Sequence, residues 1–229
     1  MESISVFDIL KIGIGPSSSH TMGPWRAVQQ CLTEFQESHS IEHIESIQVE
    51  LFGSLAKTGS GHGTDIAIML ALRGFEPETI DCEKILLYLD EIKQRKKIVV
   101  LGEKVMPFDP EYDFNFNREK QFEFHSNALE ISVKYGTDRV FSTLLFSIGG
   151  GFVVKGPADE SPFTKLPFPI EKAKDLLSWC HREQASISEI VMRNELVWRS
   201  TTEIEHALNE IVNTMTYCVY TVSYTHLRA

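Results

Sequence analysis

Two glycine-rich segments of the sequence carry the side chains best suited to chemistry. One spans Gly13 to Pro24 and the other spans Gly53 to Asp65, and each contains several hydroxyl groups, one histidine and a predicted helix at its end. The free N–H groups and the dipole at a helix N-terminus favour an anion such as a carboxylate. An imidazole beside such an anion can act as a general acid or base near neutral pH. We therefore expect these two segments to form a binding or catalytic site.

The same side chains also have structural interpretations. Serine and threonine before a helix usually cap it, and we favour capping for the hydroxyl residues of the first segment taken singly: Ser17, Ser18, Ser19 and Thr21. Capping of the next helix is also favoured for Thr64 and Asp65, although a capping residue can still contact a ligand. His20 and His62 stay open between a hydrogen-bonded structural role and a catalytic role. The presence of two such segments in one domain favours function.

Familiar motifs for phosphate binding, hydrolysis and metal binding are not matched. Thr64 stands where G-x-G-x-x-G requires its last glycine. The stretch from Gly15 to Ser19 ends in serine where the nucleophile elbow of hydrolases requires glycine. The cysteines form no C-x-x-C pair, so neither a disulfide framework nor a cysteine metal site follows from their spacing: Cys31, Cys82, Cys180 and Cys218. We expect no metal ligands in this chain.

Charge and composition restrict the class of protein. The 229 residues carry a formal net charge of −10 and no basic stripe, which argues against a nucleic-acid partner. The longest strictly apolar run, Ile66 to Leu72, is far shorter than the roughly 20 residues that a membrane helix needs, so we expect no membrane partner. The N-terminus lacks the features of a signal peptide. We therefore expect a cytoplasmic protein with reduced thiols.

Apolar periodicity predicts the elements that position the two segments. An amphipathic helix over 24–35 follows the first segment. A strand over 47–51 precedes the second segment, which we expect to be a loop, and a buried helix over 66–72 follows it. Further patterns predict a helix over 85–92 and strands over 98–101, 122–124, 129–135 and 140–146. The fold class expected is α+β, with a mixed or antiparallel sheet packed with helices.

The chain is predicted to contain more than one domain. We expect the α+β domain to span residues 1–156 and the prolines of 157–169 to form an extended linker. Two capping-box pairs then open helices: Ser186 with Glu189, and Ser200 with Glu203. We interpret 170–219 as the first helices of an incomplete all-α domain, because their apolar stripes need further partners. Residues 220–229 resemble a translated sequencing adapter and are interpreted as a non-native tail, with a native strand as the alternative.

Two further motifs accompany the glycine-rich segments: His125-Ser126-Asn127, and the stretch from Phe146 to Val153. Together the four motifs resemble the signatures of the iron–sulfur-dependent L-serine dehydratases. Ser126 departs from the His-Pro-Asn segment of that family. Asn194-Glu195 and residues 215–219 resemble the opening of the family's helical domain, so the resemblance covers nearly everything up to Val219.

The resemblance implies conversion of L-serine to pyruvate and ammonia without pyridoxal phosphate. A [4Fe-4S] cluster, with one iron lacking a cysteine ligand, would bind the serine hydroxyl as a Lewis acid while a base removes the α-proton. The first domain would resemble the allosteric serine-binding domain of phosphoglycerate dehydrogenases, and the helical domain would carry the cluster cysteines. The complete form is expected to be a homodimer.

The resemblance also implies roles for individual residues. His62 would be the base or a proton-relay group, and Thr64 and Asp65 would support His62 or touch the substrate. The carboxylate and amine of serine would be bound or oriented by the first segment, through Ser17, Ser18, Ser19, His20 and Thr21. The family's cluster cysteines lie further downstream than this chain reaches. We therefore expect this chain alone to hold no cluster and not to turn over serine.

Functions from other classes remain as alternatives to a truncated L-serine dehydratase. A non-catalytic amino-acid-sensing module would use the same segments to bind serine. The helices after the linker favour the enzyme, because a stand-alone sensor does not need half of a helical domain. A hydrolase built on the three consecutive serines lacks both the nucleophile elbow and an evident oxyanion site.

Overall fold

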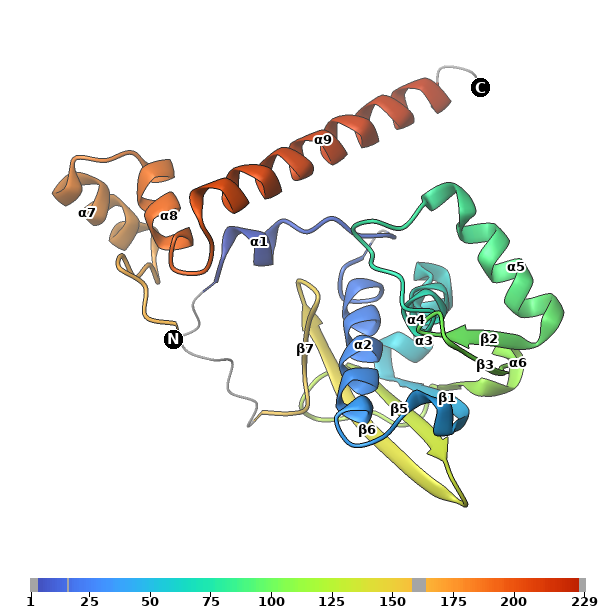
Figure 1. The fold of residues 1–229 in the computed structure, drawn as a ribbon. Helices are drawn as coiled ribbons and strands as arrows, with labels where there is room; N and C mark the ends of the chain where they lie inside the picture. The colour runs from blue at the N-terminus through green and yellow to red at the C-terminus, as the bar shows by residue number, and fades with distance from the viewer. Residues whose placement is uncertain (1–3, 16, 158–163, 227–229) are drawn as a thin grey trace. The chain divides into compact units, whose positions relative to one another are not determined.

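The computed structural model describes residues 4–15, 17–157 and 164–226, and the chain divides into two compact units (Figure 1). One unit is formed by residues 13–159. The other joins residues 1–12 to residues 160–229.

A mixed five-stranded sheet is the centre of the unit formed by residues 13–159. Its strand order is β4-β1-β5-β6-β7, in which β1 and β4 are parallel and the other neighbours are antiparallel. The bounds are β1 Ile44–Phe52, β4 Phe114–Asn117, β5 Asn127–Tyr135, β6 Arg139–Gly149 and β7 Phe152–Val154. A separate antiparallel pair consists of β2 Lys97–Val100 and β3 Lys104–Pro107. The predicted α+β fold with a mixed sheet is confirmed.

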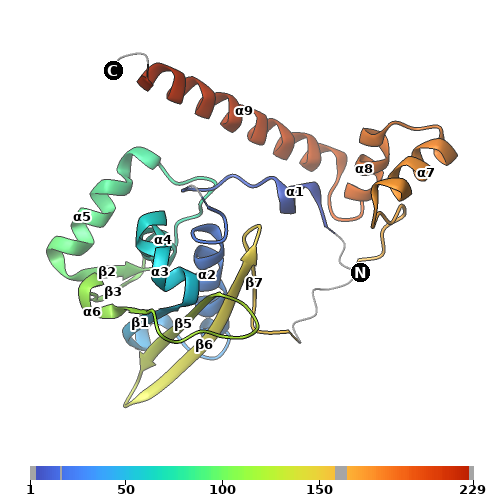
Figure 2. The ribbon, with the colours of Figure 1, turned by 180° about the vertical axis from the view of Figure 1, so that it is seen from behind.

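Helices cover one face of this sheet, as Figures 1 and 2 show from opposite sides. Helix α2 packs against β6, β7 and α4, and α3 packs against β1 and β5. The helix bounds are α2 Met22–Gln36, α3 Gly53–His62, α4 Thr64–Leu72, α5 Ile85–Arg95 and α6 Pro110–Asp113, with 3₁₀ turns η1 Ile41–His43 and η2 Cys82–Lys84. Along β1 the buried side chains of Ile47, Val49 and Leu51 alternate with Gln48 and Glu50, because successive residues of a strand face opposite sides.

Two predictions for this unit were wrong. The glycine-rich segment after β1 is the helix α3 rather than a loop, because Leu55, Ala56 and Gly59 pack into the core from one side of it. Phe122 and Phe124 lie in no strand. Both rings contact Phe146 edge to face, so their alternation reflects aromatic packing instead of strand pairing.

The other unit is helical and contains the two predicted capping boxes. Its helices are α1 Val6–Ile9, α7 Ala173–Glu183, α8 Ile187–Glu195 and α9 Thr201–His226. Ser186 and Glu189 cap α8 reciprocally, and Ser200 and Glu203 do the same at the start of α9. Residues 158–163 of the predicted linker and 227–229 of the predicted tail lie outside the described residues.

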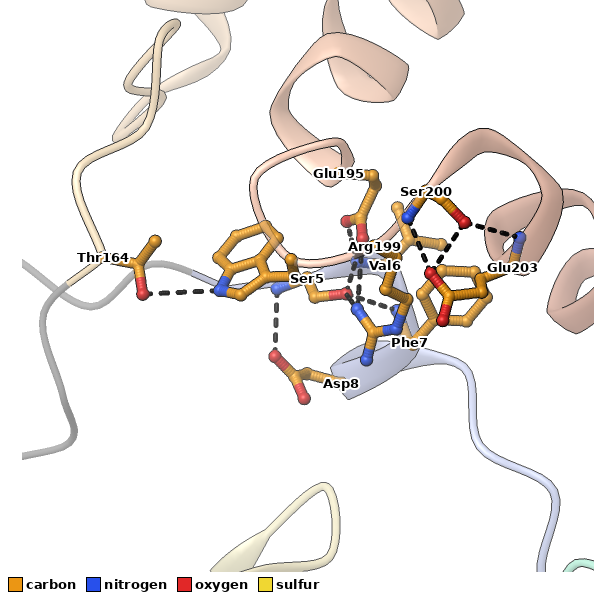
Figure 3. A network of polar contacts seen from close by, with 10 residues as sticks. Ser5, Val6, Phe7, Asp8, Thr164, Glu195, Arg199, Ser200 and Glu203 are labelled. Atoms are coloured by element: carbon orange, nitrogen blue, oxygen red, sulfur yellow. Dashed lines mark hydrogen bonds and ion pairs between the residues drawn. The ribbon is translucent and has the colours of Figure 1, made fainter.

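Residues 4–12, at the start of the described chain, are grouped with this helical unit. They are attached to it through the buried carboxylate of Glu195, shown in Figure 3. Its Oε1 accepts a hydrogen bond from the Val6 N–H at 2.7 Å, and its Oε2 accepts one from the Ser5 hydroxyl at 2.8 Å. Arg199 lies 3.6 Å from the same carboxylate and stacks over the ring of Phe7. These contacts fix the start of the described chain to α8. The domain bounds expected from the sequence stay a prediction.

The apolar stripe of α9 is largely exposed. Ile204 is buried, whereas Leu208, Val212 and Met215 are exposed by 39%, 58% and 59%. This agrees with the expectation that these helices cannot cover their own apolar stripes. Within the described part of the chain, no helix is both long and apolar enough to cross a membrane.

We predict that Glu195→Ala releases the segment that contains α1. The substitution leaves the Val6 N–H without its acceptor, and hydrogen bonds to charged groups contribute about 1.5–3 kcal/mol each. Amide hydrogen exchange at Val6 should therefore become roughly 10- to 100-fold faster. Glu210→Ala, on an exposed position of α9, is the control and should leave this rate unchanged. Equal exchange rates in Glu195→Ala and the wild type would contradict the prediction.

Candidate functional site

The first glycine-rich segment forms a tight turn that leads into α2. The N–H groups of His20 and Thr21 both donate to the carbonyl of Ser17, and the Thr21 hydroxyl donates to the same carbonyl at 2.7 Å. The Gly23 N–H donates to the carbonyl of Ser18. No side-chain hydrogen bond caps α2. The capping roles favoured for the hydroxyls of Ser17, Ser18, Ser19 and Thr21 are therefore wrong, because these residues build the turn itself.

Three polar side chains of α3 lie along one face of the helix. Ser54, Thr58 and His62 are spaced four residues apart, and residues at this spacing are neighbours on a helix surface. The Thr58 hydroxyl donates to the Ser54 carbonyl at 3.0 Å. The face that these residues form is directed toward His20 of the preceding turn.

The His20 imidazole connects the turn to α3. Its Nδ1 lies 3.0 Å from the Ser19 hydroxyl and 3.4 Å from the Ser17 hydroxyl. Its Nε2 lies 3.1 Å from the hydroxyls of both Ser54 and Thr58. Both ring nitrogens are thus hydrogen-bonded, so the ring orientation is fixed from two sides.

The two histidines predicted as site residues lie next to each other. The ring centroids of His20 and His62 are 4.8 Å apart and the ring planes are tilted by 36°. Nδ1 of His62 lies 2.8 Å from the Thr58 carbonyl oxygen. Partial burial, followed by the nearby charge of His62, lowers the pKa of His20, while a backbone contact at Ser54 opposes the change. The lowered pKa favours the neutral form of the His20 ring.

The start of α4 completes this cluster. Gly63 adopts φ = +74°, which glycine tolerates and which allows α4 to begin directly after α3. The buried Thr64 hydroxyl donates to the His20 carbonyl at 2.6 Å, and no side chain caps α4. The capping roles favoured for Thr64 and Asp65 are therefore wrong. Oδ1 of Asp65 is buried and has no hydrogen-bond partner among the described residues.

Residues from two later motifs, on β5 and β6, hold the turn in place through hydrogen bonds. The fully buried Ser147 of β6 donates through its hydroxyl to the Ser19 carbonyl at 2.8 Å. Asn127 at the start of β5 donates through Nδ2 to the Ser147 carbonyl at 3.2 Å. Gly23 is required in α2 because an added Cβ would overlap Ser147 Oγ and lie 2.6 Å from Ser147 Cβ. The geometry of the turn thus depends on the contact between α2 and β6.

The described residues do not fit an iron–sulfur cluster. They contain no group of three or more histidine, cysteine, aspartate or glutamate side chains that could hold a metal ion. The cysteines are distributed over α2, η2, α7 and α9. Burial, together with the charge of Glu34, raises the pKa of the Cys31 thiol to about 12, which favours the protonated thiol at neutral pH.

Most residues of the cluster were predictable from the sequence, and some were not. The structure brings together Ser17, Ser19, His20, His62 and Thr64 through direct contacts. Ser18 is exposed and contributes its carbonyl, and the Thr21 side chain is occupied within the turn. The contributions of Ser54, Thr58 and Ser147 were missed. The four-residue spacing of the hydroxyls before His62 was the available signal, but the glycines led us to expect a loop.

The sequence matches a family model and several curated proteins. The model described as "Serine dehydratase beta chain" matches residues 5–158. L-serine dehydratase 1 of Escherichia coli is 34% identical over 224 residues, with 94% of this chain and 48% of the relative covered. The L-serine dehydratase of Mycobacterium tuberculosis is 38% identical over 221 residues, with 94% and 48% covered. This chain therefore spans about half the length of these relatives.

We predict that Gly23→Ala destabilises the unit that holds the turn. The added Cβ would force α2 away from Ser147, and such overpacking typically costs about 1–3 kcal/mol. Urea unfolding measures this loss. Adding Ser147→Gly should restore part of the stability because it removes the overlapping atoms. Gly61→Ala is the control, since nothing lies within 4 Å of its added Cβ; an equal loss in both alanine variants would contradict the prediction.

Proposed function

This chain belongs to the serine dehydratase beta chain family, and on that premise we propose that it forms the substrate-binding half of an L-serine dehydratase. In the proposed reaction, the α-proton and the β-hydroxyl of L-serine leave as water. The resulting aminoacrylate tautomerises and is hydrolysed to pyruvate and ammonia. The cytoplasmic location and the homodimer expected from the sequence remain part of this proposal.

The pairing of His20 with His62 is the observation that carries the proposal. His62 donates through Nδ1 to a backbone carbonyl, which leaves Nε2 as the atom that can accept a proton. We assign to His62 Nε2 the removal of the α-proton. A neutral His20 beside it avoids a second positive charge when His62 takes up that proton.

The polar groups around this pair are suited to the ends of an amino acid. Ser17 and Ser19, together with the N–H groups at the start of α4, would bind the carboxylate. The unpartnered Oδ1 of Asp65 would accept a hydrogen bond from the ammonium group, which offsets the cost of burying that oxygen without a partner. Thr64 would hold the two segments in register through the His20 carbonyl.

The [4Fe-4S] cluster implied by the sequence resemblance has no ligand set among the described residues. We therefore assign substrate binding and proton transfer alone to these residues. Assistance to the departing hydroxyl would come from sequence that this chain does not share with its relatives, since it spans about half of their length.

A serine-binding module without catalytic activity is the second candidate function. It would use the same hydroxyl and imidazole groups to bind serine. The two candidates share the binding site and differ in proton transfer by His62.

We predict that His62→Ala in the full-length protein lowers kcat for L-serine by about 10²- to 10⁴-fold, which is the usual contribution of a general base. Pyruvate release measures this rate. His43→Ala, on an exposed position in a different turn, is the control and should retain wild-type turnover. Near-normal turnover in His62→Ala would remove His62 from the chemistry, whereas no pyruvate release from the wild-type full-length protein would favour the binding module.

We also predict that Asp65→Asn weakens L-serine binding to this chain by roughly tenfold or more, because a hydrogen bond between two charged groups is lost. Isothermal titration with L-serine measures the change. L-glycerate, which lacks the amine, should bind wild type and variant equally. A variant that weakens both ligands to the same extent would show that Asp65 acts on the structure of the site and not on the amine.

A further inference from the structure

Thr58 contacts both histidines of the site through two different atoms. Its hydroxyl oxygen lies 3.1 Å from Nε2 of His20, and its carbonyl oxygen lies 2.8 Å from Nδ1 of His62. The residue occupies the middle of the polar face of α3, four residues after Ser54 and four before His62. It carries no chemistry of its own in the proposed reaction.

The direction of the bond to His20 follows from the hydroxyl proton. A hydroxyl has one proton to donate. Thr58 donates it to the Ser54 carbonyl at 3.0 Å, because a carbonyl oxygen can only accept. With that proton directed to the Ser54 carbonyl, His20 Nε2 is the donor at the Thr58 oxygen, and the Ser54 hydroxyl, also 3.1 Å from Nε2, is a second acceptor. In the neutral ring this leaves Nδ1 without a proton, in position to accept from the Ser19 hydroxyl at 3.0 Å.

The direction of the bond to His62 follows from the carbonyl. A carbonyl oxygen only accepts, so Nδ1 of His62 carries the proton and Nε2 carries the lone pair in the neutral ring. A histidine without such a partner favours the opposite arrangement in water. One residue thus holds two adjacent imidazoles in opposite protonation patterns.

We propose that Thr58 is the positioning residue of the histidine pair: its hydroxyl fixes the proton of His20 on Nε2, and its carbonyl fixes the proton of His62 on Nδ1. This inference deepens the proposed function and rests on it for its catalytic meaning, because it makes His62 Nε2 the basic atom. It is nevertheless testable in the absence of substrate, since the proton positions belong to the free protein.

Two matched substitutions separate the hydroxyl from the rest of the residue. Thr58→Val keeps the branched shape and removes the hydroxyl, whereas Thr58→Ser keeps the hydroxyl. Thr58 is exposed, and valine and threonine have similar helix propensities, so α3 should persist in both variants. Neither substitution changes the backbone carbonyl, and His62 therefore serves as an internal control.

The experiment is a set of long-range ¹H–¹⁵N spectra of the ligand-free 229-residue chain with labelled histidine, recorded as a function of pH. In the wild type we expect His20 protonated on Nε2 and His62 protonated on Nδ1. In Thr58→Val the Nε2 proton of His20 should exchange about fivefold faster, the effect of losing one hydrogen bond. Its titration midpoint should also move to lower pH, since the charged ring donates the stronger hydrogen bond and loses more than the neutral ring does. Thr58→Ser should match the wild type.

Three results would overturn the inference. They are a His62 ring that carries its neutral-state proton on Nε2, wild-type behaviour of His20 in Thr58→Val, or the same change in Thr58→Ser as in Thr58→Val. A shift of the His62 signals in Thr58→Val would likewise show that the residue acts through helix structure and not through its hydroxyl. Adding L-serine afterwards tests the proposed function separately, because failure to bind serine leaves the proton positions of the free chain unaffected.

Discussion

The close contact between α2 and β6 is the constraint on which the candidate site depends. Gly23 has no side chain, and Ser147 uses the space to reach the Ser19 carbonyl from a fully buried position. This hydrogen bond fixes the position of the turn before α2 relative to the sheet. His20 then meets α3, and its backbone carbonyl meets Thr64. A site made of short polar side chains is thereby positioned by packing in the core.

The regular elements of the fold were predictable because their apolar residues repeat with a clear period. The alternation along β1 and the stripe along α2 are both present in the structure, and so is the capping box at Ser186. The strand β2 was predicted from the consecutive β-branched residues of 98–100, whereas β3 and β4, which are equally short, were missed because they contain no comparable run. The helix α3 was missed because its glycines suppress the usual signal of helix propensity.

The candidate site was predictable in composition and only partly in geometry. The histidines and the hydroxyls of the first turn were identified from their residue types, and the structure brings them into contact. Which group bonds to which could not be derived from the sequence, because it depends on helix phase. Thr58 acquires its position between the rings from the helical spacing of α3, and Ser147 acquires its position from the register of β6 against β5.

The attachment of the chain's first helix to Glu195 has a consequence for folding during synthesis. Ser5 and Glu195 are 190 positions apart, and the unit of residues 13–159 lies between them in the sequence. At typical rates of translation, roughly 10–40 s separate the emergence of these two residues from the ribosome. The intervening unit has time to fold first. Until Glu195 emerges, the segment with the exposed side chains of Ile4, Ile9 and Leu10 lacks its contacts with that residue. During that interval the Ser5 hydroxyl and the Val6 N–H are hydrogen-bonded to water instead of to Glu195.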